Sequence, residues 1–424
     1  MRILFLNLYF PPDTSATAKS AESMVHALAQ THEVTVLCGR PSYDPTERRP
    51  WKLWQTERLN TKGSQQIGET ARASFTVIRV GSTDYPRIQM NRRILNYLTY
   101  VKLAVCSALF IPCDVIFAMT DPPFNGIVSA FLSVLKRKPL IYDIQDMYPD
   151  MAVAGSIVQP GLLTRFWEHL HRWALRRATR IIVLGDDMRA RIIAKGAKGP
   201  KGPESIESAK VFIVRSGVDT DPATSPPLPL NPEVTRAIRG NFRFVLLHAG
   251  NLGFYGAWDT VIAAARKLEN ENIGFVFVGD GAERSRLENL AAGANNVRFL
   301  PFFPSSDISS VLAAPDAHIV TIKRGLEGVV VPSKMFGIIA AGKPIVAVAA
   351  AETDVATLGL HHGFAIYADP TNPDELASSV RRLAADPAAL VSMAQAAVQA
   401  AQQYSRAHEL RILQSIVEGL GHRA

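Results

Sequence analysis

The sequence predicts an α/β protein with two parallel-sheet domains, each doubly wound, that face each other across a cleft. Short apolar strands alternate with helical stretches along almost the whole chain. The 424 residues exceed what one ordinary core holds, so two domains of about 200 residues each are expected. A proline-rich stretch, TDPATSPPLPLNPEV, interrupts the alternation once, and the alternation then restarts.

The expected strands fall into two sets. The first set is Ile3–Leu8, Val34–Leu37, Phe75–Val80, Val115–Met119, Leu140–Ile144, Ile181–Leu184 and Val211–Val214. The second set is Phe244–Ala249, Gly274–Val278, Val297–Leu300, Ala317–Thr321, Ile345–Ala349 and Phe364–Tyr367. Ligands of such sheets bind at the carboxyl ends of the strands, so we expect the functional site in the cleft.

These sets define the expected domains. We predict an N-terminal domain over 1–218, a linker over 219–240, a second domain over 241–400 and a C-terminal helix over 401–424 that packs back toward the first domain. Two long loops are expected as well. One spans Ser42–Ser74 and is basic and aromatic (Arg48, Arg49, Trp51, Lys52, Trp54), and the other spans 195–210 and has low complexity.

Charge is distributed unevenly between the two halves. The net charge is +8, but residues 1–215 hold 29 Lys and Arg against 18 Asp and Glu, whereas residues 216–424 hold 17 against 20. The first half should therefore meet an anionic partner: a lipid surface, a phosphate-bearing acceptor or nucleic acid. Two basic helical stretches, 91–110 and 162–180, fit either core-facing helices with solvated basic sides or a surface for anionic lipid.

The sequence also bears on the compartment. Cys38, Cys106 and Cys113 are sparse and lack metal-ligand spacing, which favours a reducing cytosol. The start, MRILFLNLYFPP, reads as a strand and not as a signal peptide, and no apolar run reaches about 18 residues. We expect a cytoplasmic protein, peripheral on the inner face of the membrane.

The turn after the first strand argues strongly against an NAD- or FAD-binding protein. It reads PPDTSATAKSAESM, and residues 11 to 38 contain no glycine, although a dinucleotide site needs a glycine-rich turn. Thr14, Ser15 and Thr17 stand there instead. These hydroxyls could line the cleft, but helix capping alone explains one of them.

Three strand–turn–helix junctions of the second domain converge on one sheet edge. HAGNLG ends one strand with Asn251 and Gly253, and FVGDG ends the next with Gly279, Asp280 and Gly281. In VPSKMFGIIAAGKPIVA, Ser333 is expected to cap a helix over Met335–Ala341, which places Lys334 in the positive first turn. A surface lysine is the plain interpretation of that position. The convergence of glycine turns and helix N-termini favours a nucleoside diphosphate site.

One strand of the first domain ends in polar residues. YDIQDMYPDM places Asp143, Gln145 and Asp146 there; Asp143 could be a structural carboxylate, and Asp146 should face the cleft. The Asp-Thr-Asp at 219–221 lies at the start of the linker, and we interpret it as a chance match. The histidines show no metal-ligand spacing, so no metal site is expected.

Over nearly its full length the chain resembles a family 4 glycosyltransferase of the GT-B fold, in the bacterial branch that builds O-antigen and colanic-acid-type exopolysaccharides. The resemblance rests on NLYFPPD, MTDPPF, YDIQDMYPDM, RATRIIVLGDDMRARI, SGVD, HAGNLG, FVGDGAERSRLE, VRFLPF and VPSKMFGIIAAGKPIVA, in the family's order. It implies a nucleotide-sugar donor (UDP- or GDP-linked) in the second domain and a polyprenyl-phosphate-linked or saccharide acceptor in the first. It further implies transfer with retention, no cofactor and no required metal.

The resemblance also implies roles for individual residues. Asp146 and Lys334 would be catalytic, with Lys334 and the Asn251–Gly253 turn on the donor diphosphate. The remaining donor-side residues would be Gly279, Asp280, Gly281, Phe302, Glu327 and Ser333, and the acceptor-side residues Ser15, Thr17, Gln145 and Asp146. Four positions depart from the family. Gly256 lies near the place of its lysine or arginine, and Gly337 takes the place of its ribose-binding glutamate. Gln145 replaces the histidine of its His-Asp pair, and Ser216 replaces the asparagine of its Asn-Gly-Val-Asp.

Three other functions fit parts of the sequence. A nucleotide-sugar epimerase or hydrolase of the same architecture would need no acceptor. A non-catalytic nucleotide-sugar-binding partner would bind donor without releasing nucleoside diphosphate, as Gly256 and Gly337 suggest. Nucleic-acid binding through the basic half ranks last, because no recognition motif supports it.

Overall fold

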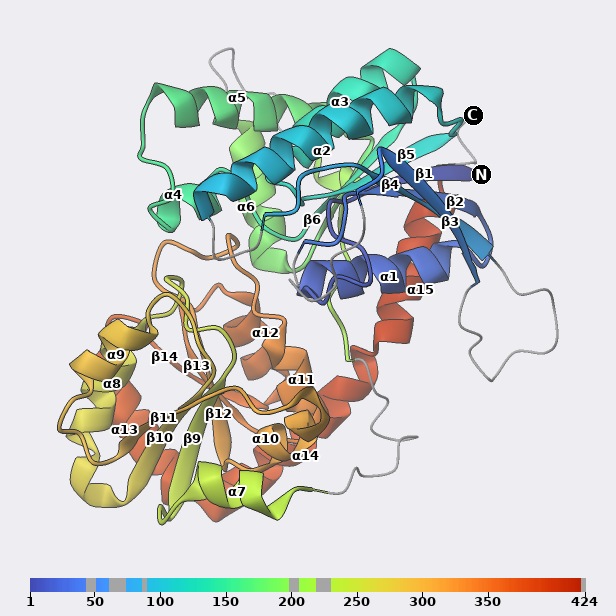
Figure 1. Cartoon of the computed structure of the whole chain (residues 1–424). Helices are drawn as coiled ribbons and strands as arrows, with labels where there is room; N and C mark the ends of the chain where they lie inside the picture. Colours follow the sequence, from blue (N-terminus) through green and yellow to red (C-terminus); the bar gives the residue numbers. More distant parts are fainter. Residues whose placement is uncertain (43–50, 61–73, 86–89, 198–205, 219–229, 421–424) are drawn as a thin grey trace.

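The computed structural model describes residues 1–42, 51–60, 74–85, 90–197, 206–218 and 230–420, which form two α/β domains (Figure 1). The first domain contains β1 (Arg2–Leu6), α1 (Ala16–Leu28), β2 (Glu33–Cys38), β3 (Trp54–Asn60), β4 (Ser74–Val80), α2 (Met90–Phe110), β5 (Val115–Met119), α3 (Asn125–Lys136), β6 (Leu140–Ile144), α4 (Asp150–Ala154), α5 (Leu162–Arg177), β7 (Arg180–Val183), α6 (Asp186–Ala197) and β8 (Val211–Ile213).

The second domain is built from α7 (Pro232–Arg239), β9 (Phe244–Ala249), α8 (Trp258–Lys267), β10 (Ile273–Val278), α9 (Arg284–Leu290), β11 (Val297–Leu300), α10 (Ile308–Ala313), β12 (Ala317–Thr321), α11 (Lys334–Ala340), β13 (Ile345–Val348), α12 (Asp354–His362), β14 (Ala365–Ala368), α13 (Pro373–Ala384) and α14 (Pro387–Gln403), and α15 (Arg406–Glu418) ends the described chain.

The two sheets confirm the predicted fold class. Their strand orders are β3-β4-β2-β1-β5-β6-β7-β8 and β11-β10-β9-β12-β13-β14. Within the described residues, every strand pair is parallel except β3 with β4. In both sheets the strand order reverses beside the first strand of the domain, which is where a doubly wound sheet opens its ligand crevice.

The expectation of an unbroken loop over Ser42–Ser74 is wrong. Residues Trp54–Asn60 form edge strand β3, which pairs antiparallel with β4, and Trp54 Nε1 donates to Ser107 Oγ of α2 at 2.7 Å. The strand escaped prediction because its residues, WQTERLN, are mostly polar and exposed, as an edge strand allows. Arg48 and Arg49 lie outside the described residues.

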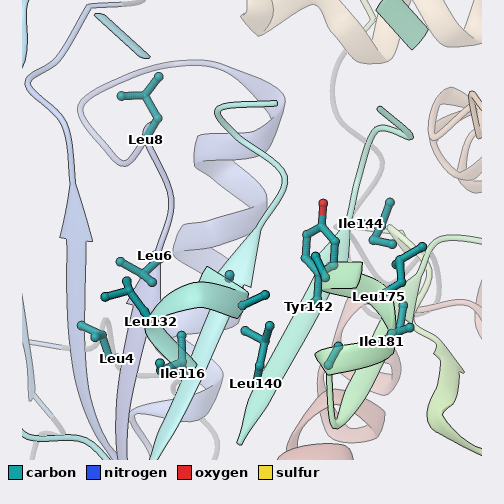
Figure 2. Close-up of a cluster of buried hydrophobic side chains, with 14 of the residues drawn as sticks. Leu4, Leu6, Leu8, Ile116, Leu132, Leu140, Tyr142, Ile144, Leu175 and Ile181 are labelled. Atoms are coloured by element: carbon teal, nitrogen blue, oxygen red, sulfur yellow. The ribbon is translucent and has the colours of Figure 1, made fainter. Parts of the chain in front are cut away.

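Helices cover both faces of the first sheet. On one face Ile116, Leu140 and Tyr142 pack with Leu132 of α3 and Leu175 of α5, as Figure 2 shows. Helices α2, α3 and α5 lie side by side in this layer (Figure 1). On the opposite face, α15 packs beside α1, and Gln414 Nε2 donates to the Ala27 carbonyl at 2.8 Å. The final helix of the chain therefore closes the core of the first domain.

Two expected boundaries need correction. The linker was expected to reach residue 240, but Pro232–Arg239 form α7, whose Val234 and Ile238 are buried against the second sheet. Asn231 starts this helix by accepting from the Glu233 N–H, with Pro232 at the first position. The C-terminal helix was expected from residue 401, but α14 continues to Gln403 and α15 starts at Arg406. Residues 219–229 and 421–424 lie outside the described chain, and with them the Asp-Thr-Asp at 219–221.

The chain passes between the domains twice, near Val218 and near Ser405, and backbone hydrogen bonds join these two segments. Val218 N–H donates to the Tyr404 carbonyl at 2.7 Å, and Arg406 N–H donates to the Val218 carbonyl at 2.8 Å. Gly217, with φ +68°, permits this approach, because a Cβ there would lie 2.9 Å from Arg406 Cα. The two segments that connect the domains are therefore fixed against each other.

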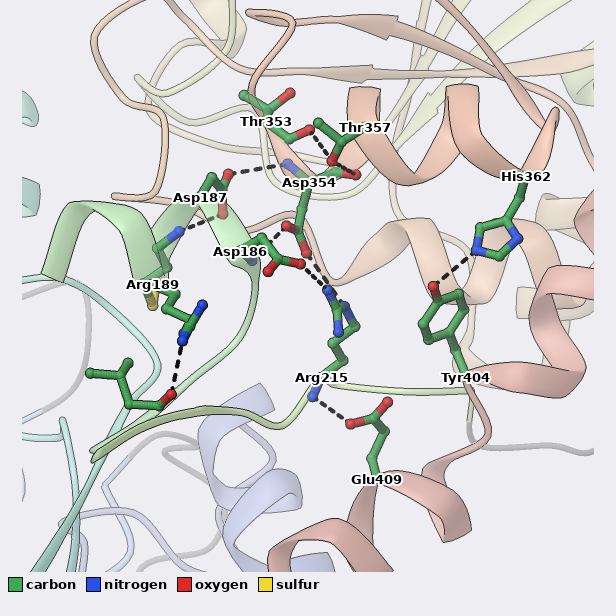
Figure 3. Close-up of polar contacts among 12 residues, drawn as sticks. Asp186, Asp187, Arg189, Arg215, Thr353, Asp354, Thr357, His362, Tyr404 and Glu409 are labelled. Carbon is green, nitrogen blue, oxygen red and sulfur yellow. Dashed lines mark hydrogen bonds and ion pairs between the residues drawn. The ribbon is translucent and has the colours of Figure 1, made fainter. Parts of the chain in front are cut away.

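A polar network beside the crossings ties the two domains together (Figure 3). The Asp186 N–H of α6 donates to Asp354 Oδ1 at 2.7 Å, and the Asp354 N–H of α12 donates to Asp187 Oδ2 at 3.3 Å. Each helix N-terminus is therefore capped by a carboxylate of the other domain. Arg215 joins the network through Asp186 Oδ2 at 2.7 Å and Asp354 Oδ2 at 3.5 Å, and Gly185 leaves room for the Asp354 carboxylate. These contacts fix how the two sheet edges face each other.

None of the described helices has the length and hydropathy that crossing a bilayer requires.

Candidate active site

Two glycine turns form the base of the site at the carboxyl ends of β9 and β10. They are hydrogen-bonded to each other: Gly250 N–H donates to the Val278 carbonyl at 2.8 Å, and Leu252 N–H donates to the Asp280 carbonyl at 2.8 Å. Gly279 has φ +139°, and a Cβ there would lie 2.0 Å from the Gly250 carbonyl oxygen. The backbones of the two turns can pack this closely only with glycine at that position.

Lys334 lies beside these turns. Its Nζ is 3.2 Å from Nε2 of His248, at the end of β9, and 3.3 Å from where a Cβ on Gly250 would be. Among the described residues, no carboxylate lies within 4.0 Å of this Nζ. Burial lowers the pKa of Lys334 to about 7. An amine this desolvated, without an anionic partner in the described chain, is poised to receive one.

His248 supplies no negative charge to the pair. Burial, and secondarily the neighbouring Lys334, lower the pKa of His248 well below its ordinary value, so the imidazole is neutral. Its ring packs edge-on against Trp258 at 4.7 Å between centroids. The lysine is therefore positioned by a neutral group, and its charge stays available to a ligand.

The expected cap of this helix is wrong in one respect. α11 begins at Lys334, and the exposed Ser333 makes no side-chain hydrogen bond to the first turn, because its own backbone is already helical at φ −58° and ψ −22°. A capping side chain needs extended backbone at that position. Gly342 does end the helix, with φ +64°.

The other predicted donor-side residues lie around the same turns. Asn251 is exposed, and its side chain lies near both Gly253 and Gly281. Asp280 Oδ1 accepts from the Gly281 N–H at 2.8 Å, so this carboxylate stabilises its own turn. Phe302 is 60% exposed, with its ring edge beside Gly279. Its open aromatic face could stack on a base.

Glu327 lies on the loop between β12 and α11. Its Oε1 accepts from the Gly325 N–H at 2.9 Å, and its carbonyl accepts from Arg191 of α6 at 3.0 Å. The side chain therefore stabilises its own loop, which also contacts the first domain.

The structure accounts for Gly256. A Cβ at this position would lie 2.2 Å from the Trp258 ring, and Trp258 Nε1 donates to the Gly253 carbonyl at 2.7 Å. The indole thus holds the first glycine turn and excludes a longer residue at 256. Gly337 differs, because a Cβ there would meet only Leu312, at 3.6 Å.

The opposing edge belongs to the first domain and carries carboxylates. Burial, and secondarily the nearby Asp121, raise the pKa of Asp146 to about 7. Burial also raises the pKa of Asp121, against the effects of its hydrogen bond with Thr17 and of the Arg93 guanidinium. Arg93 Nη2 donates to Tyr9 Oη at 2.9 Å. The edge therefore offers hydroxyls, a cation and two weakly acidic carboxyls to a polar ligand.

The remaining acceptor-side residues hold this edge in shape. Ser15 is buried and caps α1 through the Ala18 N–H at 3.1 Å, which matches the capping alternative. Gln145 Nε2 donates to Asp143 Oδ2 at 2.7 Å, and Thr120 Oγ1 accepts from the Gln145 N–H at 2.7 Å. Asp143 is fully buried, and burial raises its pKa to about 7, so it is a structural group.

A run of aromatic rings leads away from the Asp146 edge. Tyr97 contacts Phe124 at 6.3 Å between centroids, Phe124 contacts Trp167 at 5.9 Å, and Trp167 stacks on Tyr148 at 5.9 Å. Tyr148 lies close enough to Asp146 and Asp121 for both carboxylates to raise its pKa. Aromatic faces beside carboxylates are typical of sugar-binding surfaces.

One close contact joins the first-domain edge to the second domain. Gly155, which ends α4, approaches Phe254 of the second domain so closely that a Cβ would lie 2.8 Å from the ring. Because Phe254 directly follows Gly253, this contact sets the first-domain edge against the donor-side turns.

Sequence reasoning missed four groups: Thr120, Asp121, Arg93 and His248. Asp121 follows β5 as Asp146 follows β6, so the strand-end argument applied to MTDPPF would have found it. Arg93 and His248 carry no local signal, because tertiary packing alone brings them to the site. Among the described residues, no group of three His, Cys, Asp or Glu side chains could hold a metal.

Comparison with known proteins identifies both domains. A family model described as a glycosyl transferase 4-like domain matches residues 15–203, and one described as glycosyl transferases group 1 matches residues 243–386. WcaI of Escherichia coli (strain K12), named for glycosyl transfer in colanic acid biosynthesis, is 25% identical over 90% of this chain and 92% of its own. WbjE of Pseudomonas aeruginosa, named as a glycosyltransferase, is 24% identical over 69% of this chain and 73% of its own.

Solved structures share the fold. Anabaena Alr3699/HepE in complex with UDP matches with a TM-score of 0.65 at 16% identity, over 99% of this chain and 100% of its own. HepE in complex with UDP-glucose matches with a TM-score of 0.62 at 18% identity. WaaG, a glycosyltransferase involved in lipopolysaccharide biosynthesis, matches with a TM-score of 0.61 at 18% identity, over 99% of this chain and 100% of its own. A glycosyl transferase 4-like domain followed by a group 1 domain, on this shared GT-B fold, confirms that the chain belongs to the family of glycosyltransferases that its sequence resembles.

Proposed function

We propose that the protein is a retaining glycosyltransferase that moves a hexosyl group from a UDP- or GDP-sugar to a lipid-linked or saccharide acceptor during surface polysaccharide synthesis. The names of WcaI and WaaG place those relatives in colanic acid and lipopolysaccharide biosynthesis, which supports the pathway class. HepE was solved with UDP and UDP-glucose, which supports a nucleotide-sugar donor.

The observation that carries the proposal is the environment of Lys334. A desolvated amine, a neutral imidazole and two glycine turns with helices after them converge at one sheet edge. A diphosphate supplies the negative charge that Lys334 lacks among the described residues, and backbone N–H groups and helix N-termini add to the attraction. The exposed ring of Phe302 and the Gly279 backbone then lie where the nucleoside would extend.

The chemistry follows from this placement. The bond between the anomeric carbon and the diphosphate oxygen breaks, an acceptor hydroxyl oxygen bonds to the same face of that carbon, and the hydroxyl proton leaves toward the departing diphosphate. Negative charge grows on the diphosphate as the sugar becomes oxocarbenium-like. Lys334 in its protonated form stabilises that charge, so the step needs no metal in this proposal.

Asp146 is the proposed contact for hydroxyl groups of the sugar or acceptor. It lies at the first-domain edge, across from the donor turns, with Thr17 and Asp121 nearby. An ionised carboxylate there accepts hydrogen bonds from hydroxyls and stabilises positive charge on the sugar ring.

We also propose that the protein works as a peripheral protein on the inner face of an anionic membrane. Helices α2, α3 and α5 carry eight Lys and Arg but one acid, Glu168. Large apolar side chains are exposed on the same three helices, with Phe110 at 87% and Leu162 at 83%. Cations beside exposed apolar groups suit anionic headgroups.

One observation favours a second candidate, a non-catalytic binding partner. Trp258 excludes a cation at position 256, so Lys334 would neutralise the diphosphate without that second charge.

A single experiment separates the candidates. The protein is incubated with UDP- and GDP-sugars and a polyprenyl-diphosphate-linked sugar in EDTA, and released nucleoside diphosphate and the anomeric configuration of the product are measured. Acceptor-dependent release with retained configuration supports the proposal, and donor binding without release supports the non-catalytic candidate.

A further inference from the structure

A cleft lies between α4, α5 and α6 of the first domain and the 325–329 loop of the second. Its volume is about 690 Å³, enough for a drug-sized ligand. We call it the basic cleft. Its charged lining residues are Arg165, Arg172, Arg191, Lys195, Asp150 and Glu168.

The cations of this lining outnumber its carboxylates. Lys195, which is buried, lies between Asp150 at 2.5 Å and Glu168 at 2.6 Å. Asp150 also forms an ion pair with Arg191 at 3.0 Å, and Glu168 also forms one with Arg172 at 2.8 Å. Three cations therefore share two carboxylates, and with Arg165 the described lining holds four cations against two carboxylates, a net charge of +2. A doubly charged phosphate group has the complementary charge.

The basic cleft opens beside an apolar surface. Its walls include Arg165 and Glu168 on α5, and the first turns of that helix expose Leu162, Leu163 and Phe166 at 83%, 70% and 60%. A ligand that fits both features has an anionic head and an apolar chain. A soluble sugar phosphate would leave the apolar turn uncovered.

We propose that the basic cleft binds the phosphate or diphosphate headgroup of an amphiphile whose apolar chain lies along the exposed first turns of α5. The inference rests on the proposed function and deepens it, because a prenyl-diphosphate-linked sugar acceptor is such an amphiphile. An anionic phospholipid has the same chemistry. Arg191 also donates to the Glu327 carbonyl at 3.0 Å, so the bound headgroup contacts side chains that join both domains.

The test uses the full-length protein and isothermal titration with four probes: geranyl diphosphate, inorganic diphosphate, geraniol and dihexanoyl phosphatidylglycerol below its micelle concentration. Geranyl diphosphate should bind at least about tenfold more tightly than inorganic diphosphate or geraniol, since it engages both the charged and the apolar part. Arg165→Glu should weaken it by about tenfold or more. Arg165 is exposed, so this variant should fold. Arg236→Ala, which removes an exposed cation on α7, is the control and should change nothing.

Two comparisons decide the assignment. Equal binding of geranyl diphosphate by wild type and Arg165→Glu would overturn the proposal, and so would loss of binding in Lys334→Met, because the probe would then occupy the donor site. Equally tight binding of the phospholipid would support the headgroup site and assign it to membrane lipid. UDP-glucose and GDP-mannose are titrated into the same samples. Retained donor binding with failed geranyl diphosphate binding refutes this inference alone, whereas failed donor binding counts against the proposed function.

Discussion

Nζ of Lys334, in the first turn of α11, lies 3.2 Å from Nε2 of His248, at the end of β9 and 86 residues earlier in the chain. The imidazole is neutral and the amine is desolvated, so the protonated Lys334 is held in place without a neighbouring negative charge and is free to bind an anion. This relationship makes the second-domain edge a receptor for negative charge, and the predictions about the donor follow from it.

Donor binding should take up a proton. The pKa of Lys334 is lowered to about 7 in the free protein, and a bound diphosphate favours the charged amine and raises that pKa. At pH 8 the free amine is mostly neutral, so UDP-glucose binding should take up nearly one proton, and affinity should fall as pH rises above about 7. Isothermal titration in buffers of different ionisation enthalpy measures the uptake. The diphosphate diester of the ligand does not titrate in this range, and Lys334→Met should abolish the effect.

The close contact of the glycine turns should be intolerant of a methyl group. Gly279→Ala places a Cβ 2.0 Å from the Gly250 carbonyl at φ +139°, so we expect the free energy of unfolding to fall by about 3 kcal/mol and donor affinity to be lost. Gly293→Ala is the matched control. It also has positive φ, at +83°, but no atom within 4 Å of the new Cβ, so backbone strain alone should cost about 1 kcal/mol. Equal losses in urea titration would show that contact between the turns is unimportant.

Asp146 should matter for turnover and not for donor binding. Asp146→Asn should lower kcat by about 10²–10³ and leave the donor Kd within about twofold, because its carboxylate lies on the opposite edge. Its pKa is about 7, so wild-type turnover should fall as pH drops below 7 and the carboxyl is protonated, and this limb should disappear in the variant. Asp114→Asn, which loses a carboxylate bound to Arg2, is the control. A variant with normal kcat would remove Asp146 from the reaction.

The capping aspartates should couple the two domains. Asp354→Ala removes the cap of α6 and a partner of Arg215, so we expect a loss of about 2–4 kcal/mol and unfolding in two separate transitions. Asp374→Ala breaks an exposed pair with Lys267 and should cost less than about 0.5 kcal/mol. Differential scanning calorimetry distinguishes the variants. A single unshifted transition for Asp354→Ala would mean that the domains are held together by other contacts.

The fold was predictable because buried parallel strands are short apolar runs. Val115–Met119 and Leu140–Ile144 are strands with the expected bounds, and every expected strand has its counterpart. The edge strand β3 was missed because half-exposed polar residues carry no such signal. Its position depends on pairing with β4, which lies beyond the local sequence.

The candidate site was predictable only where its residues follow the ends of strands. The glycine turns, Asp146 and Lys334 were located from that rule, but the first turn of a helix also predicts an exposed lysine. Lys334 is instead partly buried beside His248 and Gly250, which only the assembled sheet brings near. Glu327, expected near the donor, stabilises its own loop, because short-range hydrogen bonds compete with ligand contacts.

The most direct test of the account is the binding of UDP, GDP, ADP and dTDP, with their sugars, to wild type and Lys334→Met at pH 7. Lys343→Met is the control: Lys343 Nζ bonds the Pro315 carbonyl, away from the glycine turns. We predict that wild type and the control bind one diphosphate saturably, and that Lys334→Met, which should remain folded, binds it about 10²-fold or more weakly. Undiminished binding in a folded Lys334→Met would contradict the claim that this lysine holds the donor diphosphate.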